Sequence, residues 1–164
     1  MRNRSKGIID LNLYELCAVD NKYITDVSFM KNLRKLNANG LFCGIDQNGI
    51  AGLDLTELNI SDNTNITDIS FMKNLHTLRV SKSLARLCEI NQAGITGLNL
   101  WALSASNNPK IVDVSFMNNL HVLLAIGLLK SSTFAPASID DPYGSFSGGI
   151  NCGIGKKEFL EIPI

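Results

Sequence analysis

The chain has 164 residues, with 15 basic and 15 acidic side chains and a formal net charge of zero. This length fits one domain with a core of its own, and the lack of a basic surplus argues against a nucleic-acid partner. Charged residues form only 18% of the chain, whereas asparagine (18 residues), leucine (22) and isoleucine (17) are abundant. A composition rich in asparagine and aliphatic residues but poor in charged residues is typical of a chain with internal repeats.

The sequence carries no signal that predicts export or a membrane span. The basic start, residues 1–6, is not followed by the apolar core of a signal peptide. The most apolar run, Val122–Leu129, is far shorter than the roughly 20 residues that cross a bilayer. Four scattered cysteines form neither a disulfide framework nor a zinc motif. We therefore expect an intracellular protein with reduced thiols, no membrane association, no cofactor and no metal.

In chain order, two kinds of segment alternate. The segment I-T-D-V-S-F-M-K-N-L begins at Ile24 and returns with few changes at Ile66 and Ile111. The segment C-G-I-D-Q-N-G-I begins at Cys43 and returns at Cys88 as C-E-I-N-Q-A-G-I. Each follows an opening of the form L-x-x-L-x-(A, I or V), and these openings start at residues 13, 33, 55, 75, 100 and 120. We call the units that begin at 13, 55 and 100 the Asn units, and those that begin at 33, 75 and 120 the Cys units.

Each opening has the pattern of a short strand. Its fourth and sixth positions are apolar and alternate with polar neighbours. Strands this short are stable only when neighbouring units stack and bury a continuous core. Because all units run in the same direction, we expect a parallel sheet. The spacing of Ile66, Ile69 and Met72 predicts a tight helical or 3₁₀-like return segment with one buried edge.

These units resemble leucine-rich repeats over about residues 7–127. The Asn unit, with N-x-x-I-T-D-V-S-F-M, resembles the bacterial internalin-type repeat, and the Cys unit resembles a shortened cysteine-containing repeat. Their alternation resembles the repeat arrays of giant amoeba-infecting viruses. The resemblance implies an α/β solenoid: a horseshoe segment with a parallel concave sheet and short 3₁₀ or irregular convex returns. A viral source would place the protein in the cytoplasm of an infected host cell.

The resemblance also implies an asparagine ladder at the strand ends. A buried amide there can satisfy backbone groups that have left the sheet. The ladder residues are Asn21, Asn63 and Asn108.

The repeat pattern divides the chain. Residues 1–12 are a partial N-terminal repeat, and residues 13–127 are the solenoid. Residues 128–151, rich in Ser, Gly, Pro and Ala, are expected to be a loop insertion. Residues 152–164 are expected to be a degenerate repeat or cap. Three extra residues within Ser83–Leu87 predict a small bulge.

Other recurring side chains have structural explanations. Three aspartates each precede a serine by two residues and are expected to act as turn or capping residues at the start of the return segments: Asp26, Asp68 and Asp113. Cysteines at an inward position are expected to be buried as small apolar groups at Cys43, Cys88 and Cys152. Cys17 lies at an outward strand position and is expected to be exposed.

No motif predicts catalysis, and the sequence favours a binding role. The P-loop, G-x-S-x-G and H-E-x-x-H patterns are absent. Solenoids bind partners on the polar face of their sheet, and Tyr, Trp and Arg are enriched at interface hot spots. We therefore predict a non-enzymatic scaffold that binds a protein partner through its concave face. The predicted partner-binding residues are Tyr14, Arg34, Lys35, Glu57, His76, Arg79, Trp101 and His121.

Several alternatives stay open at this point. Glu15, Lys35 and Glu57 could only satisfy one another as cross-strand pairs. Residues 128–151 could fold back over the apolar face beside Trp101. The chain could also be a self-assembling element that associates end to end through uncapped ends, or a decayed fragment of a longer array.

Overall fold

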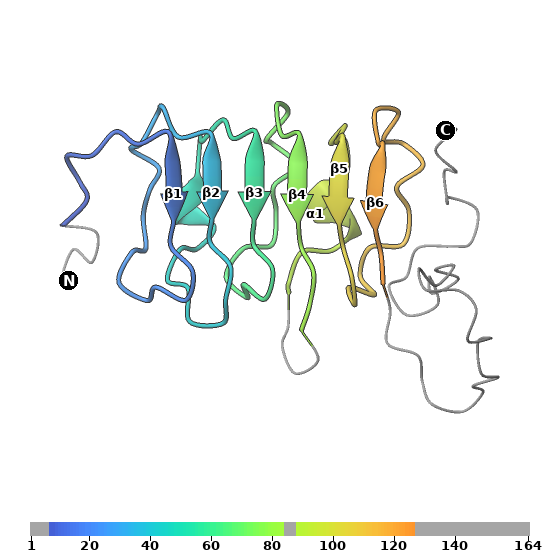
Figure 1. Cartoon of the computed structure of the whole chain (residues 1–164), viewed down its shortest axis with the longest axis horizontal. Coiled ribbons are helices and arrows are strands. Elements are labelled where there is room, and N and C mark those ends of the chain that lie inside the picture. Colours follow the sequence, from blue (N-terminus) through green and yellow to red (C-terminus); the bar gives the residue numbers. More distant parts are fainter. Residues whose placement is uncertain (1–6, 84–87, 127–164) are drawn as a thin grey trace, which may run out of the picture.

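The protein is a solenoid of stacked units, each contributing one short strand to a single sheet (Figure 1). The computed structural model describes residues 7–83 and 88–126. The strands are β1 (Glu15–Cys17), β2 (Lys35–Asn37), β3 (Glu57–Asn59), β4 (Thr77–Arg79), β5 (Ala102–Ser104) and β6 (Val122–Leu124). All neighbouring pairs are parallel, and the strands lie side by side in chain order. The predicted parallel sheet is therefore confirmed.

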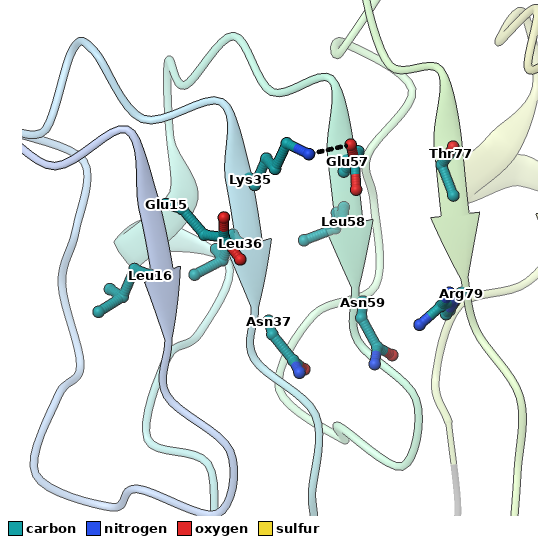
Figure 2. Close-up of a pocket in the computed structure, with 10 residues that line it drawn as sticks. All are labelled: Glu15, Leu16, Lys35, Leu36, Asn37, Glu57, Leu58, Asn59, Thr77 and Arg79. Carbon is teal, nitrogen blue, oxygen red and sulfur yellow. Dashed lines mark ion pairs between the residues drawn. The ribbon is translucent and has the colours of Figure 1, made fainter.

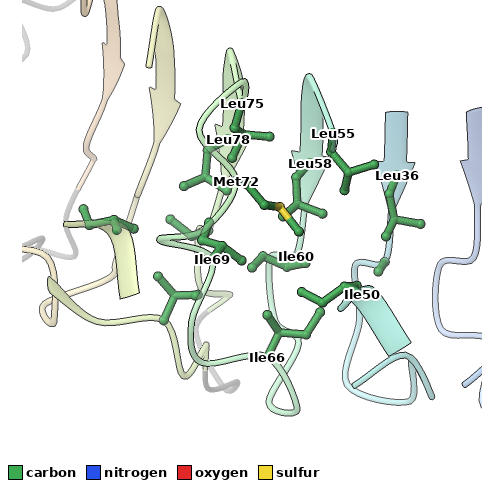
Figure 3. Close-up of a cluster of buried hydrophobic side chains, with 14 of the residues drawn as sticks. Leu36, Ile50, Leu55, Leu58, Ile60, Ile66, Ile69, Met72, Leu75 and Leu78 are labelled. Atoms are coloured by element: carbon green, nitrogen blue, oxygen red, sulfur yellow. The ribbon is translucent and has the colours of Figure 1, made fainter. Parts of the chain in front are cut away.

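The register of the sheet follows the leucines at the fourth position of each opening. Leu36 pairs with Leu16 on one side and Leu58 on the other, and the same alignment continues to β6. These leucines point away from solvent and meet aliphatic side chains of the return segments in one continuous core (Figure 3). The interior members Leu36 and Leu58 are buried, whereas Leu16 and Leu123, in the first and last units that the structure describes, are only partly buried. A unit buries its apolar face fully only when it has a neighbour on both sides.

The return segments contain less helix than the expected α/β class implies. Within residues 7–83 and 88–126 the helices are a 3₁₀ turn, η1 (Asn48–Ile50), and a single-turn helix, α1 (Gln92–Ile95). Both belong to Cys units. In that described part of the chain, no helix has the length and apolar character needed to cross a lipid bilayer.

Around Ile66, Ile69 and Met72 the buried edge of the predicted helical or 3₁₀-like return is confirmed, but no continuous helix forms there. The chain forms separate turns there, in which the Met72 N–H donates to the Ile69 carbonyl at 3.0 Å. The reason is local competition. Asp68 Oδ1 accepts the Ser70 N–H at 2.8 Å, and such a side-chain bond replaces the backbone bond that a helix would need.

Several segments named above lie outside the described residues. They are most of the predicted bulge (84–87), the loop insertion (128–151), the terminal repeat (152–164) and the first six residues of the partial N-terminal repeat. Cys152 lies outside them as well.

Candidate functional site

Asparagines at the strand ends join the Asn units that begin at residues 55 and 100 to the Cys unit before each of them. Asn63 Nδ2 donates to the carbonyls of Ala38 (3.0 Å) and Ile45 (3.2 Å). Two units later, Asn108 Nδ2 makes the equivalent pair of bonds, to the carbonyls of Val80 and Ile90, both at 3.2 Å. Both asparagines are fully buried, so the bonds replace water that cannot reach these carbonyls. The predicted ladder is confirmed at these two positions.

Asn21, the third predicted ladder residue, differs from the other two. It is half-buried, and its Oδ1 accepts the N–H groups of Tyr23 (2.9 Å) and Ile24 (3.3 Å). These bonds close a local turn. Among the described residues, Asn21 Nδ2 has no acceptor in a preceding unit, so the predicted ladder role is not seen at this position.

Buried thiols take the ladder position in the Cys units. Cys43 Sγ donates to the Ala18 carbonyl at 3.4 Å, and Cys88 Sγ donates to the Ile60 carbonyl at 3.7 Å. Burial raises the pKa of both thiols, which keeps the S–H proton in place. The predicted burial is confirmed, and the thiols also act as weak donors, which the sequence analysis did not foresee. Cys17 is exposed, as predicted.

A glutamine in each Cys unit binds the return segment of the following Asn unit. Gln47 Oε1 accepts the N–H groups of Thr67 and Asp68, both at 3.0 Å, while its Nε2 donates to the Asp68 carbonyl at 2.7 Å. Gln92 makes the same three bonds to Val112 and Asp113. This role was not predicted from the sequence. The only available signal was the recurrence of Gln at the same place in both Cys-unit segments.

Aspartates cap the turns that begin the return segments, as predicted. Asp26 Oδ1 accepts the Ser28 N–H at 2.9 Å, and Asp113 Oδ1 accepts the Ser115 N–H at 2.8 Å. Hydrogen bonds from Ser70 and Ser115 lower the pKa of Asp68 and Asp113 below the ordinary aspartate value. These caps, the ladders and the glutamines hold the strands in register and thereby position the polar side of the sheet.

The outer sheet face is the side of the sheet opposite the core, formed by the second, third and fifth residues of each opening. It carries all of the predicted partner-binding residues. Most of them are exposed, whereas Arg34 and Lys35 are half-buried. The structure thus brings the predicted residues together on one surface, because the parallel register aligns equivalent positions of successive units.

The part of this face over β1–β4 is charged and slightly hollowed. Lys35 Nζ forms an ion pair with Glu57 at 2.6 Å, and Glu15 lies opposite Lys35 in the register (Figure 2). The hydrogen bond that Lys35 donates to Glu57, and then the negative charge of Glu57, raise the pKa of Lys35. The expected cross-strand pairing is confirmed for Lys35 and Glu57. Asn37, Asn59 and Arg79 line the same depression at the opposite end of the strands.

The part of the outer face over β4–β6 is aromatic and apolar. The Trp101 ring stacks between His76 (centroids 5.5 Å apart, planes 5° apart) and His121 (6.0 Å, 21°). Trp101 is still 41% exposed, and Val122 near it and Leu124 at the far end of β6 are exposed as well. Trp101 is the only tryptophan of the chain.

The two histidines of the stack do not form a metal site with their surroundings. His121 Nδ1 lies 2.7 Å from the Asn119 carbonyl, so in the neutral ring Nδ1 carries the proton and donates it there. Within the described ranges no group of three or more His, Cys, Asp or Glu side chains could hold a metal ion.

Comparisons with known proteins find no matching family model, no matching curated protein and no matching solved structure.

Proposed function

We propose that the chain is a leucine-rich repeat scaffold without catalytic activity, which binds a protein partner through the outer sheet face. In this proposal the outer sheet face is the concave side of a horseshoe segment. The repeated openings and the ladder of Asn63 and Asn108 support the repeat assignment. The proposed protein is intracellular, and its balanced charge gives no reason for a nucleic-acid or membrane partner.

The single observation that carries the binding role is the exposed His76–Trp101–His121 stack beside a charged depression. The Lys35–Glu57 ion pair by itself gives little support for a binding role, because the two side chains already satisfy each other. The stack is different. It holds a large aromatic side chain rigid and partly open to solvent, so a partner that covers it gains apolar burial with little further loss of side-chain freedom.

Affinity capture from a lysate of the source cells tests this proposal. We expect the immobilised chain to retain a protein that Trp101→Ala and Tyr14→Ala variants retain about tenfold less, as hot-spot truncations do. Tyr23→Ala and Phe42→Ala are matched controls, because these aromatic residues are each 64% exposed but lie in loops away from the outer sheet face. Equal capture by all variants would show that this face does not bind.

End-to-end self-association is a second candidate, favoured by one observation. Ile9 and Leu11 are exposed and Leu16 is only partly buried, so the first unit presents apolar surface beside the edge of β1. A second chain could cover this surface. Sedimentation over a range of concentrations distinguishes the two candidates, since a strictly monomeric chain excludes this one.

A further inference from the structure

The charges of the outer sheet face are not balanced along its length. Over β1–β3 the acidic residues Glu15 and Glu57 both flank Lys35, which forms an ion pair with Glu57. Over β4–β6 none of the outer-face positions that the structure describes carries an aspartate or glutamate. Arg34 and Lys35 balance the two carboxylates over β1–β3, whereas Arg79 is the one formally charged side chain at the described outer-face positions of β4–β6.

Arg79 on β4 is a cation without a partner in the part of the chain that the structure describes. It is exposed, and within residues 7–83 and 88–126 its guanidinium group takes part in no ion pair or hydrogen bond. Register places Asn59 beside it on β3 and Ser104 beside it on β5. A guanidinium presents a planar fork of donors that suits a carboxylate, so this position favours an anionic group.

Two amide groups extend the donors of Arg79 across the neighbouring strands. Asn37 Oδ1 accepts the Asn39 N–H at 3.3 Å, and Asn59 Oδ1 accepts the Ser61 N–H at 3.1 Å. These bonds use the oxygen of each amide, and the Nδ2 groups have no acceptor among the described residues. Figure 2 shows the three side chains at the same level, beyond the Lys35–Glu57 ion pair. The result is a row of free donors that crosses three strands.

Apolar surface lies at a fixed distance from this row. Strands are about 4.8 Å apart, so Leu124 on β6 lies about 10 Å from Arg79 across the sheet. An extended peptide that crosses the strands advances about 3.4 Å per residue and covers this distance in about three residues. One such segment can therefore place an acidic side chain over Arg79 and an apolar side chain over Leu124.

We propose that the partner contributes an extended acidic segment that crosses the strands. A carboxylate of this segment binds Arg79 and the adjacent amide of Asn59, and an apolar side chain about three residues away packs against Leu124. This inference rests on the proposed function and specifies its ligand chemistry.

Selection from a random displayed peptide library on the immobilised full chain tests the inference. We expect the enriched peptides to share an Asp or Glu about three residues from an apolar residue. A synthetic, fluorescently labelled copy of one peptide is then titrated by anisotropy. Arg79→Glu should weaken its binding about tenfold or more, because like charges then face each other. Changing the peptide's acidic residue to lysine should restore binding to the Arg79→Glu variant.

Lys22→Glu is the matched control, because it makes the same charge change on an exposed loop residue away from the face, and it should leave the affinity unchanged. Urea midpoints verify that the variants are folded. If Trp101→Ala abolishes binding but Arg79→Glu does not, the proposal of an acidic segment is wrong, whereas the proposal that the outer sheet face binds the partner is supported. If Trp101→Ala and Arg79→Glu both leave peptide binding unchanged, both proposals fail. The proposal of an acidic segment is overturned if no peptide is enriched. It is also overturned if the chain self-associates and Arg79→Glu dissociates it.

Discussion

The Asn units and the Cys units perform the same task with different side chains. In an Asn unit, Asn63 reaches back to two carbonyls of the preceding Cys unit with short amide bonds. In a Cys unit, the same backward contact is a longer and weaker bond from the thiol of Cys88 to one carbonyl, at Ile60. The Cys unit compensates in the forward direction, since Gln47 makes three bonds to the following Asn unit.

This difference teaches that the structural period is a pair of units. Most of the side-chain bonds that hold the stack join unlike units, so neither type could repeat alone with the same contacts. A close backbone contact also joins unlike units: Gly49 of a Cys unit packs directly against Thr25 of the Asn unit before it. Four changes test this comparison, taken here from the largest expected effect to the smallest.

Gly49→Ala should give the largest loss. A Cβ built on Gly49 would lie 2.1 Å from the Thr25 carbonyl oxygen, which belongs to backbone and cannot rotate away. We expect unfolding in urea to show a loss of about 3 kcal/mol, the upper range for overpacking. Gly52→Ala is the control: it has a positive φ of 69° but only Lys31 Nζ near its Cβ position, so a loss of about 1 kcal/mol is expected. Equal losses would show that the contact between units is not the cause.

Asn63→Ala should be the next most damaging change. It leaves the buried carbonyls of Ala38 and Ile45 without these donors, and we expect a loss of about 2–3 kcal/mol in the free energy of unfolding. Cys88→Ala removes one weak donor and a small apolar group, so about 1 kcal/mol is expected from the same measurement. If Cys88→Ala proved as damaging as Asn63→Ala, the two units would hold their strand ends equally firmly.

Gln47→Ala tests the forward contact of the Cys unit. We expect a loss of about 1 kcal/mol, because the backbone groups of Thr67 and Asp68 are exposed and water can partly replace the lost bonds. Faster amide exchange at Thr67 and Asp68 should accompany it. Asn48→Ala, an exposed change in the adjacent residue, is the control for the loop itself. No change in exchange at Thr67 would refute the forward contact.

Acid should weaken the Asn units through their aspartate caps. The pKa values of Asp68 and Asp113 are lowered in the folded chain by bonds from Ser70 and Ser115. Their contribution to stability is therefore present above the unfolded value of 3.8 and is lost as the pH falls through the lowered folded values. An Asp68→Asn/Asp113→Asn double variant should show a smaller drop in urea midpoint between pH 6 and pH 2. An unchanged drop would place the acid sensitivity elsewhere.

The sequence predicts which residues lie together in the candidate site, but not how their side chains are oriented. The repeat aligns His76, Trp101 and His121 at the second position of three successive units, so their neighbourhood follows from the sequence. Their parallel stacking depends on side-chain torsions that no spacing determines. That Arg79 has no ion-pair partner among the described residues likewise emerges only when the neighbours on β3 and β5 are seen.

The sequence by itself determined the parallel arrangement of the strands and the burial of the aliphatic residues among the described units. It could do so because each unit repeats the same alternation, and a one-residue shift would turn every leucine to solvent. Only the tertiary structure decided that the returns form separate turns, that thiols alternate with amides in the ladder, and that Gln47 and Gln92 bind forward. These features depend on backbone atoms of the neighbouring unit, whose positions become defined only when the units stack.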